Sequence, residues 1–132
     1  MKQYLLDTNI CIFFLKGKHD LKSKIAKAGE SNCFISEITI AELKYGAEKS
    51  EKPAENNRVI DLFTPKFTIL PIYTSLDIYA KEKARLRRAG TIIDDFDLLI
   101  AATSVSNDMT IVTNNTSHFK RVKGIKMEDW TL

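Results

Sequence analysis

Four short apolar runs, spaced along the chain between helix-type segments, constrain the fold more than any other feature. They are residues 3–6, 33–36, 67–70 and 109–113. Short apolar strands that alternate with helices predict a mainly parallel sheet with helices on both of its faces. The expected fold class is therefore α/β, a three-layer α/β/α sandwich around a mainly parallel sheet.

The segments between these runs have helical patterns. The expected helices are residues 10–15, 21–28, 37–50, 54–63, 75–90 and 94–106, and residues 125–127 are a candidate last strand. Gly90 is placed to end its helix as the residue after the C-cap. The helix of residues 94–106 carries a stripe of small and apolar side chains, as expected where a helix packs on a sheet.

The length of 132 residues suits one domain, residues 1–132, with its own core. No apolar run reaches 18 residues, so no membrane span is expected. Asp7 interrupts the first apolar run, which argues against a signal peptide. Cys11 and Cys33 lie within apolar runs and lack a metal-binding spacing, so they are expected to be reduced, buried thiols of a cytoplasmic protein.

Three carboxylates far apart in the sequence are each placed near the end of a predicted strand. Asp7 ends the first strand, Glu42 lies in the helix after the second, and Asp97 lies in the first turn of a later helix. Ligands bind outside the carboxyl ends of the strands in such folds. Carboxylates that converge there repel one another unless a cation neutralises them. Mg²⁺ or Mn²⁺ suits this role and would supply the chemistry of a metal-dependent nuclease.

Each acid also has a purely structural interpretation. Asp7 could be an ordinary N-cap, and Glu42 could close a capping box with Thr39. Asp94, Asp95 and Asp97 all suit the positive end of a helix dipole. Asp94 is the better N-cap, Asp95 could serve either purpose, and three acids in four residues exceed what capping requires.

The run that ends at Thr113 is similar to the opening of the chain, because polar residues follow an apolar strand. Asn114 and Asn115 come next. Their amides could hold a water or a phosphate oxygen, although asparagines are also common turn residues.

The net charge is only +3, but basic residues concentrate on both sides of the acids at residues 94–97. Lys81, Arg85 and Arg88 share one helix face by their spacing. They could follow an RNA backbone, or they could form an ordinary solvated face.

Four stretches of the sequence together resemble a known family. "LLDTNICIF", "ISEITIAELKYGAEKS", "IDDFDLLIAATS" and "IVTNNTSHFKRVKGIKMEDW" are similar to PIN-domain ribonucleases, and more narrowly to the VapC toxins of VapBC toxin–antitoxin pairs. The motifs stand in the family's order over nearly the whole chain. The resemblance implies a small α/β/α sandwich and an Mg²⁺- or Mn²⁺-dependent endoribonuclease.

The same resemblance assigns roles to individual residues. The family's three acids fall on Asp7, Glu42 and Asp97, and Asn115 stands where many members have a fourth aspartate. The expectation is therefore one strongly held metal ion, on Asp7 and Asp97, with Glu42 binding directly or through water. Supporting positions, beside or behind the metal site, are Thr8, Thr113 and Asp95.

The resemblance also implies partners. VapC toxins usually form homodimers and are inhibited by a VapB antitoxin, whose C-terminal segment wraps the toxin and can insert Arg or Lys into the acidic pocket. Their substrates are structured RNAs, chiefly tRNA, and sequences of this style are similar to those that cut initiator tRNA.

Two other classes of protein remain possible from the residues alone. One is an RNA-binding module without cleavage activity. The other is a phosphotransfer domain, which the sequence disfavours because the late strand "TIVTNN" offers no partner lysine and because position 9 is Asn9, where a dehalogenase-type site would need an acid.

Overall fold

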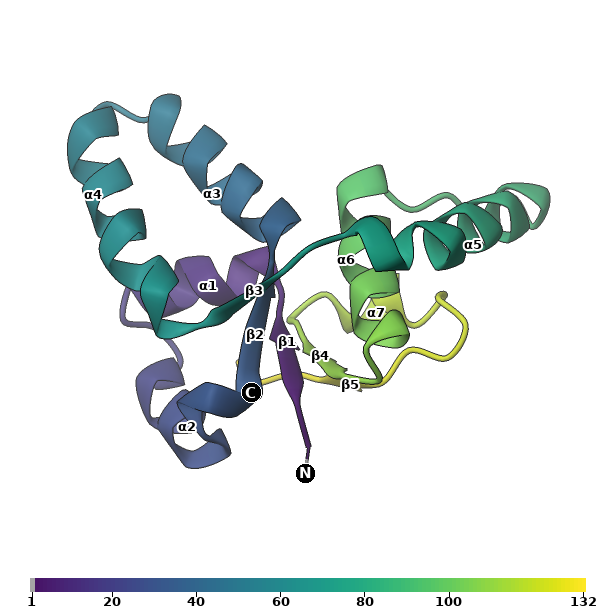
Figure 1. Cartoon of the computed structure of the whole chain (residues 1–132), viewed down its shortest axis with the longest axis horizontal. Coiled ribbons are helices and arrows are strands. Elements are labelled where there is room, and N and C mark those ends of the chain that lie inside the picture. The colour runs from purple at the N-terminus through teal and green to yellow at the C-terminus, as the bar shows by residue number, and fades with distance from the viewer. Residues whose placement is uncertain (1) are drawn as a thin grey trace.

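The computed structural model describes residues 2–132, and its centre is a five-stranded sheet (Figure 1). The strand order is β3-β2-β1-β4-β5 and every neighbouring pair is parallel. The strands are β1 (Tyr4–Leu6), β2 (Cys33–Ser36), β3 (Thr68–Leu70), β4 (Thr110–Val112) and β5 (Met127–Glu128). The predicted parallel sheet is confirmed, and β1, which holds Asp7 at its end, lies in the middle.

Helices cover both faces of the sheet. The elements are α1 (Thr8–Leu15), α2 (Leu21–Ala28), α3 (Glu37–Glu48), α4 (Pro53–Phe63), α5 (Leu76–Arg88), α6 (Asp95–Ser106) and α7 (Thr116–Phe119). Three 3₁₀ turns lie at Glu30–Asn32, Thr64–Lys66 and Tyr73–Ser75. In Figure 1, α1–α4 lie on one side of the strands and α5–α7 on the other. The expected three-layer sandwich is therefore present.

Two hydrophobic cores, one on each face, explain why the sheet is a central layer. Leu5 and Leu6 are both fully buried and point to opposite faces, as alternate residues of a strand do. Leu6 packs with residues of α1–α4, whereas Leu5 packs with residues of α5–α7. Ile111 and Val112 repeat this alternation on β4. Acids at the end of β1 therefore lie between the two helical layers.

The position at which α3 begins tests the capping-box interpretation of Glu42. α3 begins at Glu37, and Ser36 caps it by accepting a hydrogen bond from the backbone N–H of Ile38 over 3.1 Å. Thr39 lies inside the helix and is buried, so it is not an N-cap. The capping-box interpretation of Glu42 is therefore wrong, because Glu42 lies in the second turn.

Two further expectations, for the end of α5 and for the two cysteines, are confirmed. α5 ends at Arg88, and Gly90 follows with the left-handed φ of +71° that a residue after a C-cap adopts. Cys11 and Cys33 are buried free thiols. Among residues 2–132, no helix is long and apolar enough to cross a membrane.

Candidate active site

Asp7 is the centre of the candidate site and is only 4% exposed. It directly follows β1 and caps α1, with Oδ1 accepting a hydrogen bond from the backbone N–H of Thr8 over 2.9 Å. Its other oxygen, Oδ2, accepts a hydrogen bond from the hydroxyl of Thr113 over 2.8 Å. Thr113 follows β4, the strand next to β1. Asp7 is thus an N-cap, but its fixed and buried second oxygen goes beyond what capping needs.

The ionised form of Asp7 is disfavoured in this position. Burial raises the pKa of its carboxyl group to about 6, and the negative charges of Asp97 and Glu42 act in the same direction. Hydrogen bonds from Thr113 and Thr8 lower the pKa, but they do not cancel the effect of burial. The structure therefore brings the three predicted acids into one electrostatic neighbourhood.

Glu42 reaches this neighbourhood from α3. Its Oε1 accepts a hydrogen bond from the hydroxyl of Thr8 over 2.7 Å, and that hydroxyl lies 3.1 Å from the hydroxyl of Thr39. Thr8, a predicted supporting residue, thus links two acids. Its backbone N–H binds Asp7, and its side chain binds Glu42.

Asp97 approaches from the opposite layer, in the first turn of α6. Asp94 is the N-cap, as predicted, and its Oδ2 accepts from the backbone N–H groups of Phe96 and Asp97. Asp97 is half-buried, and burial is the largest of the causes that raise the pKa of its carboxyl group. The charges of Asp94 and Glu42 raise this pKa further, whereas His118 lowers it.

The short helix α7 carries a functional candidate, His118, that is not evident from the sequence pattern. His118 is half-buried, with Nδ1 lying 3.5 Å from Asp97 Oδ2 and 2.9 Å from the side-chain amide nitrogen of Asn115. Asn115 is held in turn by its backbone N–H, which donates to the Thr113 hydroxyl over 3.0 Å. The available signal was the spacing of three residues between Asn115 and His118, which places both on one face of a helical turn.

Two other predicted residues are not brought to the acids. The Oδ1 atom of Asp95 lies 2.8 Å from both the Lys83 ammonium and the Tyr79 hydroxyl, so its contacts are with α5. Arg85 binds Glu82 through two nitrogens and also donates to the carbonyl of Arg121. Of the three candidate RNA-binding residues, Arg85 is therefore engaged in contacts within the protein, while Lys81 and Arg88 are exposed.

The donor atoms around Asp7 suit a hard divalent cation. Within residues 2–132, no three Asp, Glu, His or Cys side chains lie close enough together to ligate one ion directly. Mg²⁺ does not require three, because it is usually bound by one or two carboxylates and keeps several waters. No ion pair from the described chain neutralises Asp7, although Asp7, Glu42 and Asp97 repel one another. The residues present therefore fit a partly hydrated Mg²⁺ or Mn²⁺ ion.

A parallel α/β/α sandwich with carboxylates converging at the end of its central strand is the arrangement expected of a PIN-type nuclease. The family model for the PIN domain matches residues 4–125 of this chain. The tRNA(fMet)-specific endonuclease VapC of Salmonella typhimurium is 38% identical over 131 residues, covering 98% of this chain and 99% of that protein.

Further relatives point to one group within the PIN-domain proteins. Ribonuclease VapC of Haemophilus influenzae is also 38% identical, over 132 residues that cover 98% of this chain and 99% of the relative. Among solved structures, DNA-bound VapBC from Salmonella typhimurium superimposes with a TM-score of 0.91 at 36% identity, covering 98% of this chain and 99% of that one. The chain therefore belongs to the PIN-domain family and, within it, to the VapC ribonucleases of VapBC toxin–antitoxin systems.

Proposed function

We propose that this chain is an Mg²⁺-dependent endoribonuclease, with Mn²⁺ as an alternative ion, that Asp7 and Asp97 bind the ion, and that Glu42 binds it through a water. The observation that carries the proposal is the convergence of these three acids, from the central strand and from both helical layers, around Asp7, which is buried and has no ion-pair partner in the described part of the chain. A divalent ion would supply a water of lowered pKa and would stabilise negative charge on the phosphodiester.

The residues of the chain have distinct tasks in this proposal. Thr8 and Thr113 fix both oxygens of Asp7, so the carboxylate keeps one orientation. Thr8 also fixes Glu42, which helps to orient the attacking water. Asn115, on the side of Asp97, positions a phosphate oxygen or a water. Attack by water rather than by the 2′-hydroxyl of the RNA leaves a 5′-phosphate and a 3′-hydroxyl.

We infer that the substrate is structured RNA, and specifically tRNA. The similarity to the tRNA(fMet)-specific endonuclease VapC of Salmonella typhimurium supports initiator tRNA as the first candidate. The protein is expected to act in the cytoplasm, where tRNA is found, and to form a homodimer as the resemblance to VapC toxins implies.

A VapB-type antitoxin is the proposed inhibitory partner, because the solved structural neighbours are VapBC complexes. A mostly apolar groove of about 400 Å³ between α1, α3 and α4 supports this proposal. Ile12, Leu15 and Val59 line it, and so does Glu42. A segment bound in this groove would therefore lead directly to the acidic site, where a basic side chain could pair with the carboxylates. Val59→Asp should weaken inhibition by the antitoxin while RNA cleavage is retained.

Cleavage of total cellular RNA by the purified protein tests the proposed function. We expect discrete cuts with Mg²⁺, none with EDTA, and none with Asp7→Asn, and the mapped ends should carry 5′-phosphates. Ends with a 2′,3′-cyclic phosphate would contradict hydrolysis by water. RNA binding that persists without cuts under every metal would favour a binding module that does not cleave.

A further inference from the structure

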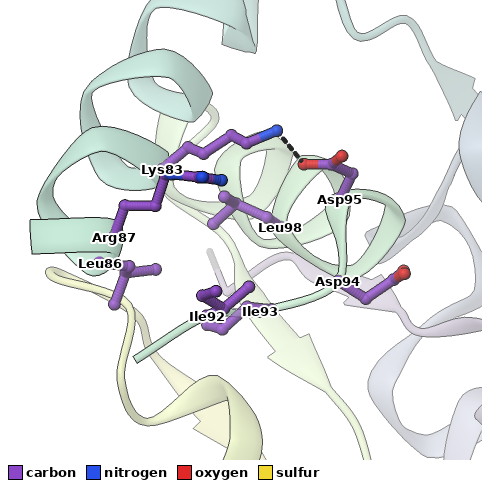
Figure 2. A pocket seen from close by; sticks show the side chains of 8 residues that line it. All are labelled: Lys83, Leu86, Arg87, Ile92, Ile93, Asp94, Asp95 and Leu98. Carbon is purple, nitrogen blue, oxygen red and sulfur yellow. Dashed lines mark ion pairs between the residues drawn. The ribbon is translucent and has the colours of Figure 1, made fainter. Parts of the chain in front are cut away.

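A second cleft lies beside the acidic site, between α5 and the segment that leads into α6 (Figure 2). Its volume is about 240 Å³. Leu86, Ile93 and Leu98 are buried and form its apolar floor, while Ile92 stands at the rim with 68% of its surface exposed. The cleft is smaller than the ~300–1,000 Å³ of sites for drug-sized ligands, so it suits a fragment of about the size of one nucleobase.

The charged side chains around this floor have partners for only some of their polar atoms. Lys83 pairs with Asp95 Oδ1 over 2.8 Å, but Asp95 Oδ2 has no hydrogen-bond partner among residues 2–132. Arg87 is exposed, and within the same residues its guanidinium makes no ion pair or hydrogen bond. In Figure 2, Lys83 and Arg87 extend from α5 over Leu98, while Asp94 points away. The cleft thus combines an apolar floor with a planar cation and an acceptor oxygen that have no hydrogen-bond partner within residues 2–132.

The position of the cleft connects it to the acidic site. Asp95 and Asp97 are two residues apart in the first turn of α6. Successive residues of a helix are about 100° apart, so these side chains leave opposite sides of that turn. The acidic site lies on one side of the beginning of α6 and the cleft on the other. A strand of RNA that crosses this turn would meet both.

We propose that the cleft binds one unpaired base of the RNA, close to the cleaved bond. This inference rests on the proposed function, because it takes RNA as the substrate. Unpaired bases are commonly recognised by stacking on a guanidinium plane and by hydrogen bonds to their edges. Arg87 covers one face of the base, the exposed side chain of Ile92 packs against the other, and Asp95 Oδ2 accepts a hydrogen bond from an exocyclic amino group. Adenine, cytosine and guanine carry such a group, and uracil does not.

The test uses a stem–loop RNA with a randomised loop and three variants of the full chain. Arg87→Met removes the guanidinium but keeps a long apolar side chain, and Asp95→Asn alters the acceptor. Arg58→Met is the matched control, because it removes the same charge from exposed α4, which lies far from α5 in Figure 1. Binding is selected in EDTA, so that the base preference is read without cleavage, and cleavage is then measured with Mg²⁺.

We expect the wild-type protein to disfavour uracil at one loop position. Arg87→Met should weaken RNA binding about tenfold more than Arg58→Met does, as loss of one base-stacking contact would. Asp95→Asn should remove the discrimination against uracil. A wild-type protein without any base preference, or equal effects of Arg87→Met and Arg58→Met, would overturn the proposal. So would a change in oligomeric state on Arg87→Met, because the cleft would then be an interface between copies of the chain.

The same experiment separates this inference from the proposed function. Base-selective binding without cleavage in Mg²⁺ would refute the endoribonuclease and leave the base site standing. Metal-dependent cleavage without base-selective binding would support the endoribonuclease and refute the base site.

Discussion

At the scale of single residues, Asp7 combines a structural and a chemical task at one position. As an N-cap it satisfies a backbone donor at the start of α1, which contributes about 1 kcal/mol. Its burial among other acids has the opposite effect, because an ionised carboxylate loses hydration there. Such a conflict is typical of functional sites, where local stability is given up for chemistry.

Replacing this carboxylate should stabilise the metal-free protein near neutral pH. The pKa of Asp7 rises from 3.8 to about 6 on folding, so the folded state binds more protons between these values and stability falls as pH rises through that range. Above it, the full cost of about 2–3 kcal/mol remains. Asp7→Asn should raise the melting temperature in EDTA at pH 7.5 and have little effect at pH 3.5. Thermal unfolding at both pH values checks this, and an equal effect at both would exclude the ionisation penalty as the cause.

At the scale of elements, the sequence was informative where each segment has a single strong pattern. The strands at the centre of the sheet are short apolar runs, and α5 and α6 have clear helix-end signals in Gly90 and Asp94. α7 was missed because Thr116–Phe119 is one turn long, too short to show a helical period, and follows turn-forming asparagines. The sequence pattern therefore does not reveal that His118 lies against Asp97, as it does in the structure.

The charged residues of α5 and α6 show a second limit of sequence patterns. Spacing correctly placed Lys81, Arg85 and Arg88 on one helix, but it could not reveal that Arg85 is held by the nearly buried Glu82. Likewise, the sequence pattern marked Asp94 as the better N-cap but left the role of Asp95 open. Tertiary contacts separate the three acids of this turn into a cap, a partner of Lys83 and a residue of the acidic site.

The short helix α7 holds His118 close to the acidic site. Because His118 contacts both Asn115 and Asp97, His118→Ala should leave these side chains less well oriented and lower kcat about 10- to 100-fold. The melting temperature should change little, since α7 remains anchored by the fully buried Phe119. Ser117→Ala, an exposed change on the same turn, is the control. Unchanged kcat in His118→Ala would show that its contacts do not serve the reaction.

At the scale of the whole molecule, the sheet order explains why distant motifs converge. β1 is central, with β2 on one side and β4 on the other. The helices that follow β1 and β2 belong to one layer, and α6, which precedes β4, belongs to the other (Figure 1). The proposed ligands accordingly come from all three layers, with Asp7 from the central strand, Glu42 from α3 and Asp97 from α6.

A divalent ion shared by these layers should stabilise the molecule as a whole. Adding Mg²⁺ at one hundred times its dissociation constant would stabilise the folded state by about 2.7 kcal/mol, which is a shift of several degrees in melting temperature. The ion must displace the proton that Asp7 holds below a pH of about 6, so the shift should be small at pH 5 and grow towards pH 7.5.

Asp97→Asn should reduce the shift, while Asp108→Asn, which removes an exposed carboxylate at the far end of α6, should not. Calorimetric melting with and without Mg²⁺ measures this directly. A shift that is equal in both variants and independent of pH would place the ion elsewhere on the molecule.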